Sequence, residues 1–183
     1  MRPLPSMTWL LAPFAFGYFC SYFFRNINAV AGPPLAVEFA LGPAELGLLT
    51  STYFIAFAAA QIPIGMALDR FGPSRVNVVL LMLIALGAAI FANSTNLAML
   101  AVGRAFIGVG AAGMLMACMS AVPMWAPPAR IATYMGIVTA IGGMGSIVAA
   151  TPVAIAIEAI GWRNVFLVGG AFAFFVGLAT WPT

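Results

Sequence analysis

Polar side chains recur along one side of an otherwise apolar segment near the amino terminus. At steps of three and four residues, the segment carries Tyr18, Ser21, Tyr22, Arg25 and Asn28. A helix would place these side chains, named the polar stripe below, on a single face. Because a charge deep in an apolar helix is unfavourable without a pathway, a partner or a ligand, the stripe is predicted to face a water-filled cavity.

A second arginine lies inside another apolar segment. Arg104 follows Asn96 by eight residues, or roughly 12 Å along a helix. Arg25 precedes Glu38 by thirteen residues, or roughly 20 Å, so helix tilt could bring both arginines to one cavity.

Both arginines lack an acidic neighbour, because no acid lies in the core of any apolar segment. Guanidinium groups bind carboxylates and phosphates with paired hydrogen bonds, so a small anionic solute is the predicted ligand. The alternative is that Arg104 binds helix carbonyls and Arg25 pairs with an acid in an absent domain.

Other kinds of chemistry find little support in this sequence. Histidine and lysine are absent, and Cys20 and Cys118 lie inside apolar runs without metal-ligand spacing. The sequence contains no nucleophile, base and orienting group at a spacing suited to catalysis. We therefore expect no catalytic residue, no bound metal or cofactor, and no enzymatic activity. The net charge of +3 is too scattered to predict nucleic-acid binding.

The composition is that of a membrane protein, with 64% hydrophobic and 6% charged residues. About 20 apolar residues cross a bilayer, so the 183 residues allow about six spans. Apolar length and polar punctuation predict an all-α bundle with no soluble domain and spans at 7–37, 46–68, 75–92, 97–122, 131–157 and 164–181.

The distribution of arginines predicts the orientation, since basic residues near span ends stay on the cytoplasmic side. We expect both termini in the cytoplasm and the protein in a bacterial inner membrane. The cytoplasmic links would carry Arg2, Arg70, Arg75 and Arg130, whereas the outer links would carry Arg163, Glu38, Glu45 and Glu158.

Two links between spans contain a similar short pattern. Asp69-x-x-Gly72 followed by Arg75 recurs as Glu158-x-x-Gly161 followed by Arg163. This echo is consistent with three spans followed by three inverted spans, an arrangement common in secondary transporters.

Several motifs make the chain resemble the amino-terminal six-helix half of the major facilitator superfamily. The first is the link Gly65-x-x-x-Asp69-Arg70-x-Gly72-x-x-Arg75, and the second is Arg104-x-x-x-Gly108-x-Gly110 in the fourth span. Pro127 to Arg130 and Gly161-Trp162-Arg163 lead into the fifth and sixth spans, as similar sequences do in that family. The resemblance implies alternating access along a path lined by the first and fourth spans, with the polar stripe helping to bind substrate.

The link motif also has a physical interpretation. Gly65 would let helices approach closely, and Gly72 would permit a tight turn after the second span. The carboxylate of Asp69 could then meet the amino terminus of a helix. The resemblance implies that Asp69 latches this half to a second six-helix half, which would belong to the same polypeptide, a homodimer or a separate subunit.

Small residues are expected to pack helices together in the fourth and fifth spans. These helix-packing glycines are Gly108, Gly110, Gly142, Gly143 and Gly145. The leading hypothesis is thus a secondary transporter, or its amino-terminal half, for a small organic anion. The alternative is a membrane scaffold or regulatory subunit that pairs with another membrane protein.

Overall fold

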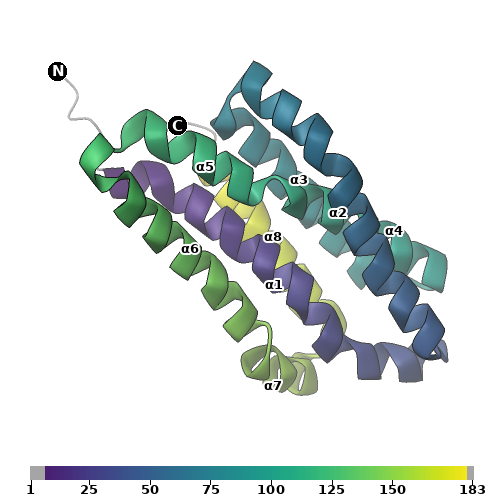
Figure 1. Cartoon of the computed structure of the whole chain (residues 1–183). Helices are drawn as coiled ribbons and strands as arrows, with labels where there is room; N and C mark the ends of the chain where they lie inside the picture. The colour runs from purple at the N-terminus through teal and green to yellow at the C-terminus, as the bar shows by residue number, and fades with distance from the viewer. Residues whose placement is uncertain (1–6, 181–183) are drawn as a thin grey trace.

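The structure, a computed structural model, describes residues 7–180. Arg2 and the expected end of the sixth span at Trp181 lie outside this range. All regular elements in the described range are helical (Figure 1): α1 (Met7–Phe39), α2 (Pro43–Phe71), α3 (Pro73–Ala92), α4 (Leu97–Ala112), α5 (Met114–Trp125), a 3-10 turn η1 (Pro128–Arg130), α6 (Ile131–Val148), α7 (Thr151–Ile160) and α8 (Trp162–Thr180).

Five helical segments of the described chain are long and apolar enough to cross a membrane. They are Pro43–Phe71, Pro73–Ala92, Leu97–Trp125, Pro128–Val148 and Trp162–Thr180. The remaining long helix, α1, has 33 residues and contains the polar stripe within its apolar sequence. The fold is therefore an all-α membrane bundle, as predicted.

The segment Leu97–Trp125, which is the fourth membrane segment when α1 is counted as the first, is divided at Gly113, between α4 and α5. Two carbonyl groups beside this break receive side-chain hydrogen bonds from other helices. Ser21 of α1 donates to the carbonyl of Ala111 over 3.1 Å, and Gln61 of α2 donates to the next carbonyl along the chain over 3.3 Å. Carbonyls without partners are unfavourable at membrane depth, so these bonds stabilise the interrupted helix.

The expected fifth span, 131–157, is also interrupted in the structure. Helix α6 ends at Val148, and α7 begins at Thr151 and runs in a different direction (Figure 1). Pro152 stands at the start of α7 and has no backbone N–H to continue the hydrogen-bond ladder of α6. Apolar length alone did not reveal this break, because the sequence on both sides of it is equally hydrophobic.

The helices pack in a pattern that follows the predicted three-plus-three repeat. Helix α3 packs chiefly against α4 and α8, α2 packs against α4, and α1 packs against α6. In terms of spans, α1–α6 is a contact between the first and fifth spans, and α2–α4 is a contact between the second and fourth spans. These two contacts map onto each other when spans one to three are superposed on spans four to six. The pairing of third with sixth maps onto itself, which is consistent with an inverted repeat.

Close helix contacts depend on several of the predicted packing glycines. A Cβ on Gly108 would lie 2.4 Å from the carbonyl oxygen of Tyr53 in α2, and one on Gly110 would lie 2.6 Å from that of Leu80 in α3. These helices therefore touch through their backbones, which larger residues would prevent.

The glycines of α6 divide into two groups. A Cβ on Gly142 would lie 2.3 Å from the ring of Tyr18, and one on Gly145 would lie 2.3 Å from the carbonyl oxygen of Phe19. Gly143 differs from the prediction, since no atom of the described chain lies within 4 Å of its Cβ position. It lies about 100° around the helix from Gly142, on a face that does not meet α1.

The link between α2 and α3 adopts the predicted tight turn. Gly72 has a φ of +79°, a conformation that favours glycine, and Pro73 begins α3. The close helix approach expected at Gly65 is not seen, because nothing in residues 7–180 lies within 4 Å of its Cβ position. Asp69 is exposed in the last turn of α2, so its carboxylate is available for contacts beyond this bundle.

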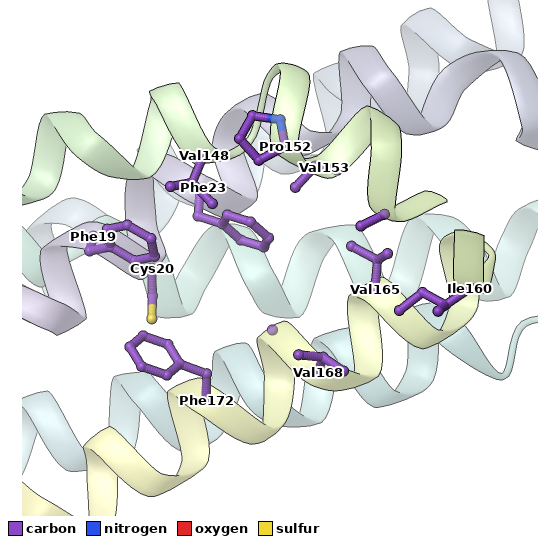
Figure 2. A pocket seen from close by; sticks show the side chains of 12 residues that line it. Phe19, Cys20, Phe23, Val148, Pro152, Val153, Ile160, Val165, Val168 and Phe172 are labelled. Atoms are coloured by element: carbon purple, nitrogen blue, oxygen red, sulfur yellow. The ribbon is translucent and has the colours of Figure 1, made fainter. Parts of the chain in front are cut away.

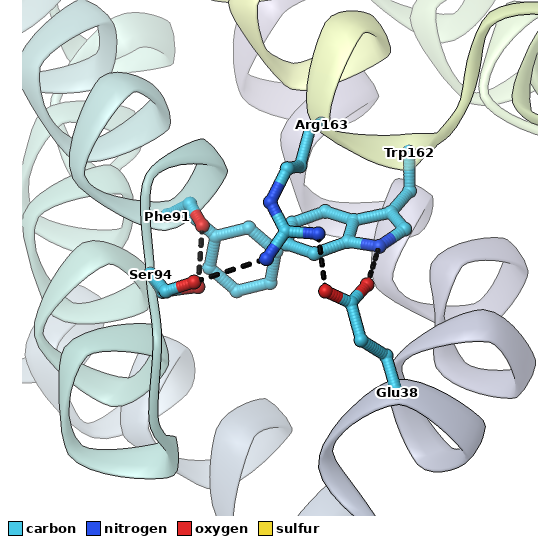
Figure 3. Close-up of polar contacts among 5 residues, drawn as sticks. All are labelled: Glu38, Phe91, Ser94, Trp162 and Arg163. Atoms are coloured by element: carbon cyan, nitrogen blue, oxygen red, sulfur yellow. Dashed lines mark hydrogen bonds and ion pairs between the residues drawn. The ribbon is translucent and has the colours of Figure 1, made fainter.

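A polar cluster at the opposite end of the bundle ties three segments together (Figure 3). Arg163, at the start of α8, forms an ion pair with Glu38 of α1 and donates to the carbonyl of Ser94 over 3.1 Å. Trp162 also donates to Glu38, over 2.8 Å, and its ring lies 5.7 Å from that of Phe91. Glu38 and Arg163 therefore share one end of the bundle, as their predicted placement in outer links requires.

The different surroundings of Gly145 and Gly143 in α6 predict different effects of a Gly→Ala substitution. Gly145→Ala should lower the free energy of unfolding by about 1–3 kcal/mol, because the added methyl meets the backbone of α1. The matched control Gly143→Ala should not destabilise the bundle, since its added methyl group points into open space. Thermal unfolding in detergent measures both, and equal effects at the two positions would contradict this packing.

The Glu38 contacts predict a pH-dependent stability. Glu38→Gln should lower the free energy of unfolding near neutral pH by about 0.2–1 kcal/mol, the range for partly exposed ion pairs. The hydrogen bond from Arg163, with that from Trp162, lowers the pKa of Glu38 below its ordinary value of 4.5. The stabilisation is therefore complete above that value and is lost as the pH falls through the lowered pKa.

Thermal unfolding from about pH 7 to about pH 3 should thus show the wild type and Glu38→Gln converging at the acidic end. Glu158→Gln is the matched control, because this exposed carboxylate forms no ion pair within the described chain. A difference between wild type and Glu38→Gln that stayed constant throughout the titration would exclude an ion-pair contribution.

Candidate functional site

A polar cavity of about 770 Å³ lies between α1 and α2. It occupies the halves of these helices that lead to their connecting link, so it is displaced toward the end of the bundle that carries Glu38. We call it the Arg25 cavity. It is lined by Arg25, Asn26, Asn28, Ala29, Gly32, Pro33, Leu46, Gly47, Thr50, Ser51 and Phe54.

Arg25 is half-buried and lies among aromatic rings. The carbon at the centre of its guanidinium group lies 5.3 Å from the ring centre of Tyr22 and 5.0 Å from that of Phe57. These contacts favour the cation by cation–π attraction. Its Nε atom is buried and has no hydrogen-bond partner among residues 7–180.

Arg104 lies behind this cavity, fully buried. Its Nη1 donates to the carbonyl of Phe24 over 2.9 Å, and its guanidinium lies 4.6 Å from the ring centre of Tyr53. Arg104 is not among the residues that line the cavity. The hydrogen bond from Arg104 to the carbonyl of Phe24 is thus of the kind expected under the alternative that Arg104 binds helix carbonyls and not an anion.

Tyr53 contacts Arg104 through its ring and also lies near Arg25. Its side chain is fully buried, and its hydroxyl interacts electrostatically with both Arg25 and Arg104. The hydroxyl, Nε of Arg25, and Nε and Nη2 of Arg104 all lack hydrogen-bond partners within the described chain. All four groups can donate a hydrogen bond, and leaving a buried donor unpaired costs about 1–3 kcal/mol.

The bundle offers no carboxylate to compensate these donors. The four acidic residues of the chain all lie near helix ends, at Glu38, Glu45, Asp69 and Glu158. Within residues 7–180, Arg163 and Glu38 form the ion pair of the structure. The region around Tyr53 is therefore rich in positive charge and has no carboxylate to balance it.

The predicted polar stripe divides between two roles. Tyr18 is buried against Gly142 and donates to the hydroxyl of Tyr22 over 3.3 Å, and Ser21 is buried with its bond to α4. Arg25 and Asn28 line the cavity, with Tyr22 beside the guanidinium of Arg25. The half of the stripe nearer the amino terminus thus joins helices, and the other half borders the polar space.

The α2 side of the site was not predicted from the sequence. Thr50, Ser51 and Phe54 line the Arg25 cavity, and Tyr53 lies behind it. The signal was present in the sequence, since the run Thr50-Ser51-Thr52-Tyr53 is polar within an otherwise apolar segment. Its position along α2 could have been matched to that of Arg25 across the short α1–α2 link.

A second pocket, of about 310 Å³, differs sharply in chemistry (Figure 2). It lies among α1, α7 and α8 near the break between α6 and α7, and its lining contains no charged side chain. Side chains such as Phe19, Phe23, Val165 and Phe172 point into it, together with the buried thiol-bearing Cys20. Such a pocket has no group that could orient a polar solute, whereas the Arg25 cavity has several.

Comparisons with known proteins agree with this architecture. The family model described as Major Facilitator Superfamily matches residues 14–182. The probable sulfoacetate transporter SauU of Cupriavidus necator is 30% identical over 154 residues, covering 84% of this chain and 36% of that protein. The niacin transporter NiaP of Acinetobacter baylyi is 32% identical over 142 residues, covering 78% of this chain and 32% of that protein.

A solved structure supports the fold independently. A bacterial homologue of the human lysosomal transporter Spinster, in an inward-facing and occupied conformation, superposes with a TM-score of 0.86 at 22% identity. The match covers 99% of this chain and 45% of that one. This chain therefore spans about a third of the length of the two curated relatives and under half of the solved chain.

The cavity geometry predicts which serines meet water. Ser51 is exposed in the Arg25 cavity, whereas Ser21 is buried, and the native thiols of Cys20 and Cys118 are also buried. A charged thiosulfonate reagent should therefore label Ser51→Cys and leave Ser21→Cys and the wild type unlabelled. Mass spectrometry of the intact protein measures the added group. Labelling of Ser21→Cys at the rate of Ser51→Cys would contradict the assigned faces of α1 and α2.

Proposed function

Because the chain belongs to the Major Facilitator Superfamily, we propose that it forms the amino-terminal six-helix part of a secondary transporter for a small organic anion. The transporter works by alternating access, in which a solute site opens to one side of the membrane and then to the other. The family supports a transport protein and not an enzyme. The solute and its binding residues are our proposal.

The observation that carries the anion assignment is the group of unpaired donors between α1, α2 and α4. Arg25 and Arg104 both lie near Tyr53, and no carboxylate of the described chain reaches them. An anionic solute in the cavity supplies an acceptor to Arg25 and compensates the positive charge of both arginines. Such charge-assisted hydrogen bonds are about twice as strong as neutral ones.

The two arginines have different parts in this proposal. Arg25 lines the cavity and contacts the solute directly. Arg104 is fully buried and acts through Tyr53, adding positive potential behind the site while holding α1 by the carbonyl of Phe24. Two relatives are named as transporters of sulfoacetate and niacin. Both solutes are small organic acids, which supports an organic anion as the solute class.

A second six-helix half completes the path in this proposal, whether from the same polypeptide, a second copy or another subunit. Exposed Asp69, in the turn with Arg70, Gly72 and Arg75, latches the two halves when the cytoplasmic side is closed. The arginine distribution supports cytoplasmic termini in a bacterial inner membrane.

Removal of Arg25 tests the anion site. Arg25→Ala should weaken binding of organic anions by about 10- to 100-fold, because it deletes charge-assisted hydrogen bonds. The anion affinity of Arg25→Lys should lie between those of the wild type and Arg25→Ala, since lysine keeps the charge but lacks the planar guanidinium group. Binding of carboxylates and sulfonates to the chain in lipid nanodiscs is measured by calorimetry, with exposed Arg130→Ala as the control.

If Arg25→Ala binds anions as tightly as the wild type while Arg130→Ala does too, the assignment of Arg25 is wrong. A wild type that binds no anion, yet still assembles with a membrane partner, would favour the alternative of a scaffold or regulatory subunit.

A further inference from the structure

We propose that the solute carries a hydrogen-bond donor beside its anionic group, and that Oδ1 of Asn28 accepts this hydrogen bond next to Arg25. This inference rests on the proposed function, since it describes the solute that the Arg25 cavity binds. It makes Asn28 a specificity-determining residue and narrows the solute class from organic anions to hydroxy acids.

The hydrogen bonds around Thr50 fix the orientation of the Asn28 amide. The hydroxyl of Thr50 donates its proton to the carbonyl of Leu46 over 3.1 Å, within α2. Its oxygen is therefore left to accept, and Nδ2 of Asn28 donates to it over 2.9 Å. If the amide were turned over, two acceptors would face each other, so Oδ1 of Asn28 is the end left free of Thr50.

Oδ1 of Asn28 has no hydrogen-bond partner among residues 7–180, although it is buried. Asn28 is 8% exposed and lines the Arg25 cavity together with Thr50. A buried acceptor without a donor is unfavourable, and the described bundle leaves this one unpaired. A donor that enters the cavity on the solute completes the pairing that the protein leaves open.

The spacing of Arg25 and Asn28 limits where that donor stands on the solute. The two residues are three apart on α1, so their Cβ atoms are about 5–6 Å apart on one face. Both residues line the same cavity, so they match a solute that carries its donor close to its acid group. A hydroxyl suits the site better than an ammonium group, because the ammonium would be repelled by Arg25 and Arg104.

Matched acids that differ by one hydroxyl test the inference. Lactate and propionate, and glycolate and acetate, are fully ionised at neutral pH and differ in the donor beside the carboxylate. Binding of each to the chain in lipid nanodiscs is measured by calorimetry. The wild type should prefer each hydroxy acid by about fivefold, the effect of one net hydrogen bond.

Asn28→Leu should abolish this preference, so that lactate and propionate bind with equal affinity. Thr50→Val, which removes the hydroxyl that fixes the amide, should reduce the preference without a change at Asn28 itself. Asn93→Leu, at an exposed asparagine after α3, is the matched control and should keep the wild-type preference.

The outcomes separate the two proposals. If the wild type binds both members of each pair equally, the donor inference is overturned and the anion site stands. If the preference persists in Asn28→Leu, the role of Asn28 is overturned. If the wild type binds none of the four acids and no other organic anion, the proposed function fails and this inference with it.

Discussion

The uncompensated positive charge inside the bundle is the constraint on which the site depends. Two guanidinium groups and one phenolic hydroxyl meet where α1, α2 and α4 converge, and several of their donors have no partner within the described chain. Burying such groups is unfavourable, so surrounding contacts must hold them in place. Aromatic rings at 4.6–5.3 Å from the guanidinium carbons and the carbonyl of Phe24 serve this purpose without neutralising the charge.

The same helices are held by contacts between backbones and by captured carbonyls. Gly108 brings α4 against the backbone of Tyr53, a residue that lies near both arginines. Ser21 and Gln61 satisfy carbonyls where the fourth membrane segment is broken, so α1 and α2 are both bonded to that segment. The position of the charged groups therefore follows from small residues and short polar side chains elsewhere on the helices.

Local chemistry explains which features could be predicted from the sequence. The turn at Gly72 and the approximate spans follow from residues that are adjacent in the chain, and the predicted Arg25 face does border a polar cavity. The division of the polar stripe could not be predicted, because the acceptor of Ser21 lies 90 residues away. Periodicity gives the face of a helix, but the neighbour that covers each part of it is set by tertiary packing. The place of Tyr53 depends on the same long-range packing.

The pairing of helices across the repeat has a mechanical consequence. Each of α1, α2 and α3 has a main partner in the following three-span repeat, so no cut between the repeats avoids a large helix contact. The Glu38–Arg163 pair adds a crosslink at one end of that boundary. The six helices that make up the two repeats are thus braced against shear between these repeats.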